Sequence, residues 1–325
     1  MFADWQEKLA QAGVAIAAIA AVVAIILLLA RLTDRRRPRD SVTAALFAGP
    51  ALILLTVGLV YPMLRTGQLS LLDASSESFV GLDNYSWIFS DPAALRGLLN
   101  TAVWLALAPI LSTAMGFFYA LLVDNARHER ITKTLMFMPM AISFVGASII
   151  WKFVYTYRDV SRPQIGLLNE ILVKLGLEPQ QFLVNGPWNT LFLIVVMVWT
   201  QTGYAMVLLS AAIKGMPGDV VEAARLDGAS GLRLVRYITV PLVRPTLVVV
   251  LTTIMIGSLK VFDIVRTMTG GQFGTQVIAN TMYDQAFRYS QPGRGSAIAV
   301  LLLVLVIPLI VYNVRQMRRN KEVRG

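Results

Sequence analysis

Long runs of apolar residues recur along the whole chain, and shorter polar segments separate them. Seven runs are about 20 residues long, the length that a helix needs to cross the hydrocarbon core of a bilayer. They cover residues 10–30, 42–64, 98–123, 134–157, 188–213, 246–265 and 296–314. The pattern predicts an all-α integral membrane protein, a bundle of about seven transmembrane helices. Kinks are expected at the prolines inside these runs, which include Pro50, Pro109, Pro139 and Pro308.

The composition supports this class and excludes several kinds of function. Of the 325 residues, 56% are hydrophobic and 15% are charged, and the mean hydropathy is +0.63. The net charge of +10 does not indicate nucleic-acid binding, because the basic residues lie in short segments between apolar runs. The chain has no cysteine and a single histidine, His128, which excludes disulfides, thiolate sites and histidine metal clusters.

The basic residues also predict how the chain lies in the membrane, because loops rich in lysine and arginine stay cytoplasmic. Of the 29 basic residues, 18 lie in alternate segments, which we assign to the cytoplasm. These segments are 31–41, 124–133, 214–245 and 315–325. With seven crossings, the N-terminus is predicted to lie outside and the C-terminus inside.

The first apolar run, 10–30, is predicted to be a retained helix rather than a signal peptide. Acidic residues Asp4 and Glu7 precede it, whereas a signal peptide carries a basic segment there and has a shorter apolar core. We therefore divide the chain into residues 1–40, a transmembrane helix with a basic cytoplasmic linker, and residues 41–325, the main transmembrane domain.

One predicted outer segment, 166–179, has leucine and isoleucine at three- and four-residue spacing, which is typical of an amphipathic helix. We interpret it as a helix on the outer rim of the bundle. A docking surface for an external protein is the alternative.

The cytoplasmic segment 214–245 is 32 residues long, which is more than a simple connection needs. Pro217 and Asp219 are typical of a helix start, and Asp227-Gly228 of a helix stop. Ser230 is placed to cap a second helix, which Pro241 and Pro245 are expected to end. The segment is predicted to be a helix-turn-helix with exposed apolar residues, which suits a groove on another protein. A hairpin folded back on the membrane is the alternative.

The residues of this segment resemble the EAA loop of ABC-importer permeases. In "EAARLDGASGLRLVRYITVP" the spacing of the pattern is kept by Glu222, Ala223, Ala224, Gly228, Ile238 and Pro241, while Val240 replaces the usual leucine. In that family the loop seats in a cleft of the ATPase subunit. The resemblance therefore implies that the ATPase-coupling residues are Glu222, Ala223, Ala224, Asp227 and Gly228.

The resemblance extends from about residue 41 to the C-terminus and narrows to carbohydrate-uptake permeases of the maltose and α-glucoside type. Its landmarks include "NTAVW" (100–104), "WTQTGYAMVLLSAAIKGMPGDVVEAA" (199–224) and "FDIVRTMTGG" (262–271). Many members continue as T-G-G-G-P, whereas this chain has Gln272 and Phe273 there. The resemblance implies a six-helix core in a bacterial inner membrane, with the run 10–30 as an addition.

The resemblance also implies partners. No G-x-x-x-x-G-K-[ST] loop for ATP phosphates occurs in the sequence, so no cofactor is expected on this chain, and ATP and magnesium belong to the partner ATPase. The implied partners are a second homologous permease, two ATP-binding subunits, an extracytoplasmic sugar-binding protein, the sugar and the lipid bilayer, with no nucleic acid. The chain is expected to be a transport subunit and not an enzyme.

A sugar path needs polar and aromatic side chains inside the bundle, where such groups are costly unless they serve a pathway. By resemblance, the path is expected to include Thr200, Gln201, Tyr204, Gly257, Ser258, Met140 and Phe144. Close helix packing is the alternative for the small residues. Gln201 and Tyr204 are larger than a close helix interface needs, which favours contact with the substrate.

Two other functions remain open from the sequence. A self-contained secondary transporter or channel would use acids within its helices or inverted repeats, but only Asp263 lies near the end of a run. An ABC permease for a non-sugar solute is the second alternative. The landmarks at 199–224 and 262–271 disfavour it.

Overall fold

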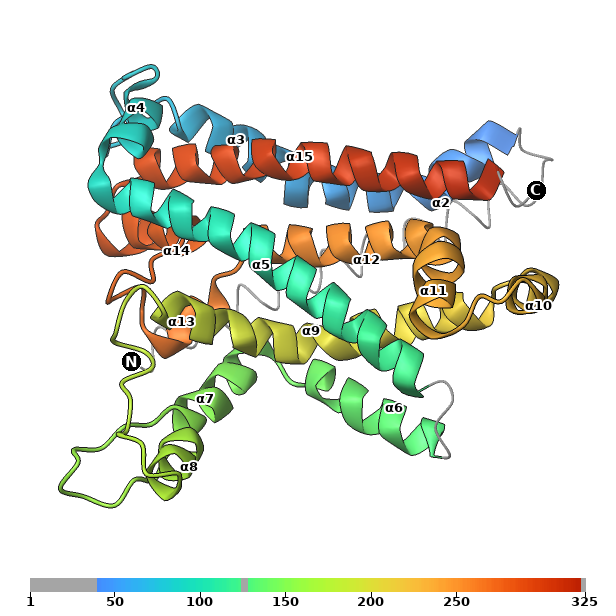
Figure 1. Cartoon of the computed structure of the whole chain (residues 1–325). Coiled ribbons are helices and arrows are strands. Elements are labelled where there is room, and N and C mark those ends of the chain that lie inside the picture. Colours follow the sequence, from blue (N-terminus) through green and yellow to red (C-terminus); the bar gives the residue numbers. More distant parts are fainter. Residues whose placement is uncertain (1–39, 124–127, 323–325) are drawn as a thin grey trace, which may run out of the picture. The chain divides into compact units, whose positions relative to one another are not determined.

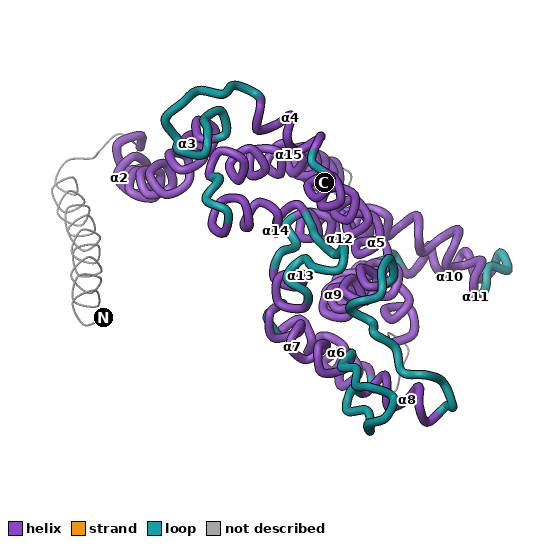
Figure 2. The backbone as a smooth tube through the Cα atoms, turned by 90° about the vertical axis from the view of Figure 1, so that its left-hand side faces the viewer, coloured by secondary structure: helices purple, strands orange, loops and turns teal. Residues whose placement is uncertain are grey.

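The computed structural model describes residues 40–123 and 128–322, and this part of the chain consists of helices and loops (Figure 2). The predicted helix 10–30, the linker after it and the position of the N-terminus lie outside the described residues. The chain forms two compact units, one ending at Gln68 and one running from Leu69 to Gly325. The division predicted at residues 40 and 41 stays a prediction.

The first unit is described from Asp40 and contains one helical run. Its parts are α2 (Asp40–Leu55), the π-turn η1 (Thr56–Val60) and α3 (Tyr61–Leu69). Residues 48–69 of this run are long and apolar enough to cross a membrane. The run covers the crossing predicted at 42–64, and it continues through Pro50.

Prolines interrupt neither α5 at Pro109 nor α15 at Pro308. Both helices belong to the second unit, which holds all the remaining helices. They are α4 (Asp83–Ser90), α5 (Pro92–Val123), α6 (Glu129–Phe137), the 3₁₀ turn η2 (Met138–Ala141), α7 (Phe144–Val154), α8 (Leu167–Lys174), α9 (Asn189–Lys214), α10 (Gly218–Leu226), α11 (Gly231–Leu234), the π-turn η3 (Val235–Thr239), α12 (Val240–Leu259), α13 (Asp263–Met268), α14 (Ile278–Tyr283), the π-turn η4 (Asp284–Arg288) and α15 (Pro292–Glu322).

Within the described residues, five helices are long and apolar enough to span a membrane, and a bent pair forms a possible sixth span. This arrangement confirms the predicted all-helical membrane fold. Residues 166–179 contain α8, as their amphipathic pattern predicts. In Figure 1, α4, α8, α13 and α14 lie at one end of the second unit, while α10, α11 and the C-terminal end of α15 lie at the other. The predicted cytoplasmic segment 214–245 and the described part of 315–325 therefore lie at the same end of this unit.

The single helix predicted over 134–157 is wrong. The helical segments Glu129–Ala141 and Phe144–Val154 meet at an angle of 101°. Ile142 has an extended backbone, and Ser143 caps α7 by accepting a hydrogen bond from Gly146 N at 3.1 Å. Pro139 was expected to kink the helix. Together with the Ser143 cap, it instead accompanies a complete break.

The prediction that Pro241 and Pro245 end the second helix of the loop is also wrong. Residues 231–259 form one helix of 29 residues, so this part of the loop is the start of a membrane helix. In η3 the Val240 N–H bonds to the Val235 carbonyl, five residues back. The wider turn makes room where the ring of Pro241 would otherwise press on a carbonyl of the preceding turn.

The crossing predicted at 246–265 is therefore shifted toward the N-terminus. It ends at Leu259, and Lys260 is its C-cap residue. The short helix α13 begins at Asp263 after this break. No glycine or proline follows Leu259 before α13 begins, so the hydropathy pattern did not predict this end.

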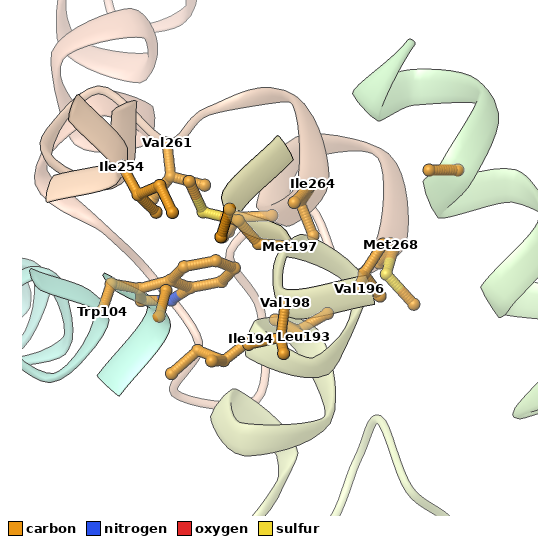
Figure 3. Close-up of a cluster of buried hydrophobic side chains, with 14 of the residues drawn as sticks. Trp104, Leu193, Ile194, Val196, Met197, Val198, Ile254, Val261, Ile264 and Met268 are labelled. Atoms are coloured by element: carbon orange, nitrogen blue, oxygen red, sulfur yellow. The ribbon is translucent and has the colours of Figure 1, made fainter. Parts of the chain in front are cut away.

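The core of the second unit lies where α5, α9 and α12 pack together. Trp104 of α5 is fully buried, and its ring lies beside Met197 of α9 and Ile254 of α12 (Figure 3). Glycines let neighbouring helices approach closely. A Cβ added to Gly116 would lie 2.8 Å from Met206 N, and one on Gly203 would lie 2.8 Å from the Phe137 Cα. Close packing of this kind is how small residues stabilise membrane helices.

Candidate functional site

The predicted coupling loop has the local structure that its sequence indicates. The helix α10 begins after Pro217 and ends at Leu226, with Asp227 as its C-cap residue. Gly228 follows with φ of 84°, a left-handed conformation that glycine adopts without strain. Two hydrogen bonds close the turn, from Gly228 N to Arg225 O at 3.1 Å and from Ala229 N to Ala224 O at 2.9 Å. This pattern is a Schellman motif, which fixes the direction of the chain after α10.

Ser230 lies at the N-cap of the next helix, as predicted, but its side chain makes no capping hydrogen bond. The cap is instead made by the backbone, since Arg233 N donates to Ser230 O at 3.1 Å. The Ser230 hydroxyl is exposed.

The loop exposes the residues that the EAA resemblance singles out. Glu222, Ala223, Asp227 and Gly228 are exposed, whereas Ala224 is buried. Two leucines flank the turn with almost fully exposed side chains, Leu226 at 84% and Leu232 at 82%. Large apolar side chains so exposed on a helical hairpin are typical of a surface that another protein covers.

A cluster of charged residues joins the base of this loop to α6. Glu129, the first residue of α6, forms ion pairs with Lys133 at 2.8 Å and with Lys214 at the end of α9. Lys133 also hydrogen-bonds to Ser210 of α9. The start of α6 is thus tied to the part of α9 that leads into α10. In the sequence, the sign of this contact is that Glu129, Lys133 and Lys214 lie in two segments that are both predicted to be cytoplasmic.

The path residues predicted on α9 fall into two groups. Thr200 is buried, and its hydroxyl donates to Met197 O at 2.9 Å. Gln201 and Tyr204 are half-buried, and the described residues offer neither side chain a hydrogen-bond partner. The latter two side chains therefore keep polar groups available for a solute, whereas the Thr200 hydroxyl is satisfied by its own helix.

The path residues predicted on α12 also differ from each other. Gly257 is exposed, and a Cβ there would meet only the Met197 Cε at 3.6 Å. Ser258 is fully buried, donates to Ile254 O at 2.9 Å and lies 3.6 Å from the Met197 sulfur. Its hydroxyl faces the packed contact between α12 and α9.

The last two path residues lie on opposite sides of the break that the sequence did not predict. Met140 belongs to η2 and is 41% exposed, whereas Phe144 begins α7 and is half-buried against the core. Gly203 of α9 packs against the backbone of Met136 and Phe137, just ahead of this break. The end of α6, ahead of the break, therefore lies beside the part of α9 that carries Gln201 and Tyr204.

Two asparagines that sequence reasoning did not single out hold the 269–276 loop. The Asn100 amide donates to Gly274 O at 2.6 Å and to Gln276 O at 2.7 Å. The Asn189 amide donates to Phe273 O at 2.8 Å. Each asparagine lies near the end of an apolar run, where a polar residue is a signal of a specific contact. The loop is fixed at both of its sides by the helices α5 and α9.

Residues 112–319 match the family model described as "Binding-protein-dependent transport system inner membrane component". The osmoprotective compounds uptake permease protein GgtC of Synechocystis sp. is 48% identical over 279 residues, which cover 86% of this chain and all of that protein. The alpha-glucoside transport system permease protein AglF of Rhizobium meliloti is 49% identical over 285 residues, covering 87% of this chain and 85% of that protein.

The fold is similar to that of a solved transporter chain. The similar chain comes from a crystal structure of a bacterial ABC transporter that imports the acidic polysaccharide alginate. The TM-score is 0.73 at 22% identity, and the match covers 90% of this chain and 98% of the other. At this identity the likeness concerns the fold.

Proposed function

The chain belongs to the inner membrane components of binding-protein-dependent transport systems, and on this premise we propose that it forms half of the translocation path for an α-glucoside or a similar oligosaccharide. Membership of this family confirms the resemblance to ABC-importer permeases that the EAA motif indicated. The chain is a multi-pass permease subunit of an ABC importer, not an enzyme. A second homologous permease would supply the other half of the path.

The observation that carries the proposal is the exposed hairpin of α10 and the start of the next helix. It presents Glu222, Ala223, Asp227 and Gly228 beside two unburied leucines, on a turn whose direction is fixed. Such a surface fits the cleft of an ATP-binding subunit. Closure of two ATP-binding subunits on ATP and magnesium would move the hairpin as a rigid body, and the helices would follow because residues 231–259 are one helix.

The ion pairs of Glu129 support the same mechanism. Movement of the end of α9 would pull on the start of α6 through Lys214. Since the helical run from α6 is broken before α7, the two halves would be free to move separately. The end of α6 packs against Gly203, between Gln201 and Tyr204. A motion at the cytoplasmic loop would thereby reach the proposed path.

The proposed cargo follows from the relatives and from the residues along α9. A neutral sugar is bound by hydrogen bonds and by contact with aromatic rings, and Gln201 and Tyr204 offer both. Gly257 leaves space on α12, and Met140 and Phe144 supply apolar contacts. Thr200 and Ser258 would support the path from within the core rather than touch the cargo.

The proposed orientation places α10 and the C-terminus in the cytoplasm and the N-terminus outside. An extracytoplasmic sugar-binding protein would deliver the cargo to the opposite end, where α4, α8, α13 and α14 lie (Figure 1). The basic segments at the α10 end agree with this orientation.

The test is transport by the reconstituted complex. The chain would be purified with the second permease and the ATP-binding subunits encoded beside it, placed in liposomes, and supplied with the neighbouring binding protein and a labelled α-glucoside. We expect ATP-dependent uptake that needs the binding protein. Uptake by this chain alone, without nucleotide, would show a secondary transporter, and an active complex that ignores α-glucosides but imports another solute would refute the cargo.

A further inference from the structure

A polar cavity of about 640 Å³ lies in the second unit at the end opposite α10. The 269–276 loop, the start of α5 and η4 surround it. Its polar lining residues are Arg96, Gln272, Gln276, Asp284, Arg288 and Tyr289. Other large cavities of the described chain are lined mainly by apolar side chains, so this one is set apart by its chemistry.

The cavity carries an excess of positive charge. Asp284 is buried, and Arg266 neutralises it through an ion pair of 2.9 Å. The other charged lining residues are Arg96 and Arg288, which are exposed and form no ion pair with a carboxylate among the described residues. Two guanidinium groups therefore face the cavity without a matching acid.

Hydrogen bonds hold the wall of this cavity in place. Asn100 and Asn189 hold the carbonyls of Gly274 and Phe273, and the hydroxyls of Thr269 and Thr275 lie 2.6 Å apart. Phe273 has φ of 56°, which is unusual for a residue with a side chain, and its ring is 51% exposed. Keeping an exposed ring on a strained backbone costs free energy, and such strain is most often found at functional sites.

We propose that this cavity is a docking pocket for an acidic segment of the extracytoplasmic binding protein, with Phe273 as the apolar contact beside it. The inference rests on the proposed function. Arg96 and Arg288 would pair with aspartate or glutamate side chains, since arginine binds carboxylates through two parallel hydrogen bonds. A neutral sugar offers no charge to match the two guanidinium groups, which favours a protein partner over a sugar subsite.

The experiment replaces both arginines in the assembled transporter. Arg96→Glu with Arg288→Glu should raise the concentration of loaded binding protein that gives half-maximal ATPase activity by about tenfold or more. Added salt should then lower this concentration instead of raising it, because like charges would face each other. Arg162→Glu, an exposed position outside the cavity, is the matched control and should leave that concentration unchanged. Arg96→Lys with Arg288→Lys should retain most of the binding.

The result separates this inference from the function on which it rests. If loaded binding protein fails to stimulate the unaltered transporter, the proposed function fails. If it does stimulate the unaltered transporter and the double glutamate variant responds at the same concentration, only the docking pocket is refuted. A variant that changes the dependence on sugar and not on binding protein would likewise refute it, in favour of a sugar site.

Discussion

Glycines at helix contacts set how closely the core of the second unit packs. Gly116 and Gly203 have backbone or side-chain atoms of another segment where a Cβ would lie, whereas Gly257 meets only the flexible end of Met197. We expect Gly116→Ala and Gly203→Ala to lower the free energy of unfolding by about 1–3 kcal/mol through overpacking. Gly257→Ala should change it little.

The measurement is the thermal unfolding of the purified complex, read by a probe of helix content. Equal unfolding temperatures for the three variants would contradict the packing account. Transport by Gly257→Ala is a separate readout, because that residue is also a proposed path residue.

Tyr204 and Ser258 offer a matched pair for the path. Tyr204→Ala should raise the KM for uptake about tenfold while assembly stays intact, since it removes a half-buried ring and a hydroxyl without a partner in the described chain. Ser258→Ala should leave KM unchanged, because its buried hydroxyl is bonded to Ile254 O. Uptake assays over a range of sugar concentrations decide this, and a normal KM in Tyr204→Ala would remove that residue from the path.

At the scale of elements, the coupling turn depends on a backbone conformation that has a counterpart elsewhere in the chain. Gly228 and Gly176 have φ of 84° and 76°, and a Cβ at either would meet nothing within 4 Å. Valine at either position strains the backbone by a similar amount, on the order of 1–2 kcal/mol. Only Gly228 lies in the proposed ATPase contact.

We therefore expect Gly228→Val to reduce uptake about tenfold or more while basal ATP hydrolysis continues, and Gly176→Val to transport normally. The comparison needs uptake and hydrolysis measured on the same proteoliposomes. Uptake that stays coupled to hydrolysis in Gly228→Val would contradict the assignment of this loop.

Elements that depend on local pattern were predictable, and those that depend on packing were not. The length of α9 and the turn at Gly228 follow from apolar period and from a glycine stop. The helix breaks at Ile142–Ser143 because Ser143 caps a new helix within a continuous apolar run. The helix continues through Pro241 because a π-turn precedes the proline. Neither choice is fixed by hydropathy, because both sides of the Ile142–Ser143 junction are apolar, whereas an arginine lies on either side of Pro241.

The residues of the candidate site were likewise predictable from the sequence only in part. The EAA pattern placed the coupling residues on one exposed hairpin, because a short motif determines a local structure. The path residues came from the family resemblance and from their positions along the helices, which cannot tell that the hydroxyls of Thr200 and Ser258 turn to their own helices. The asparagine contacts of the 269–276 loop join residues more than 80 positions apart, so sequence spacing carried no sign of them.

At the scale of the whole molecule, the orientation of the chain is open to a direct test because it has no cysteine. A single cysteine introduced at Ser230, exposed in the coupling loop, should react with a membrane-impermeant maleimide only after the cells are opened. One at Ala74, exposed in the segment before α4, should react in intact cells.

The same labelling decides whether the run 10–30 crosses the membrane. With a helix over 10–30, a cysteine at Ala3 should lie on the same side as Ala74 and react from outside, because two crossings separate these positions. If Ala3→Cys reacted only in opened cells while Ala74→Cys reacted in intact ones, the run 10–30 would not cross the membrane, and the basic segment 31–41 would share its side with the N-terminus. The proposed six-helix core would stand in either case, since its coupling loop and C-terminus are placed by Ser230→Cys.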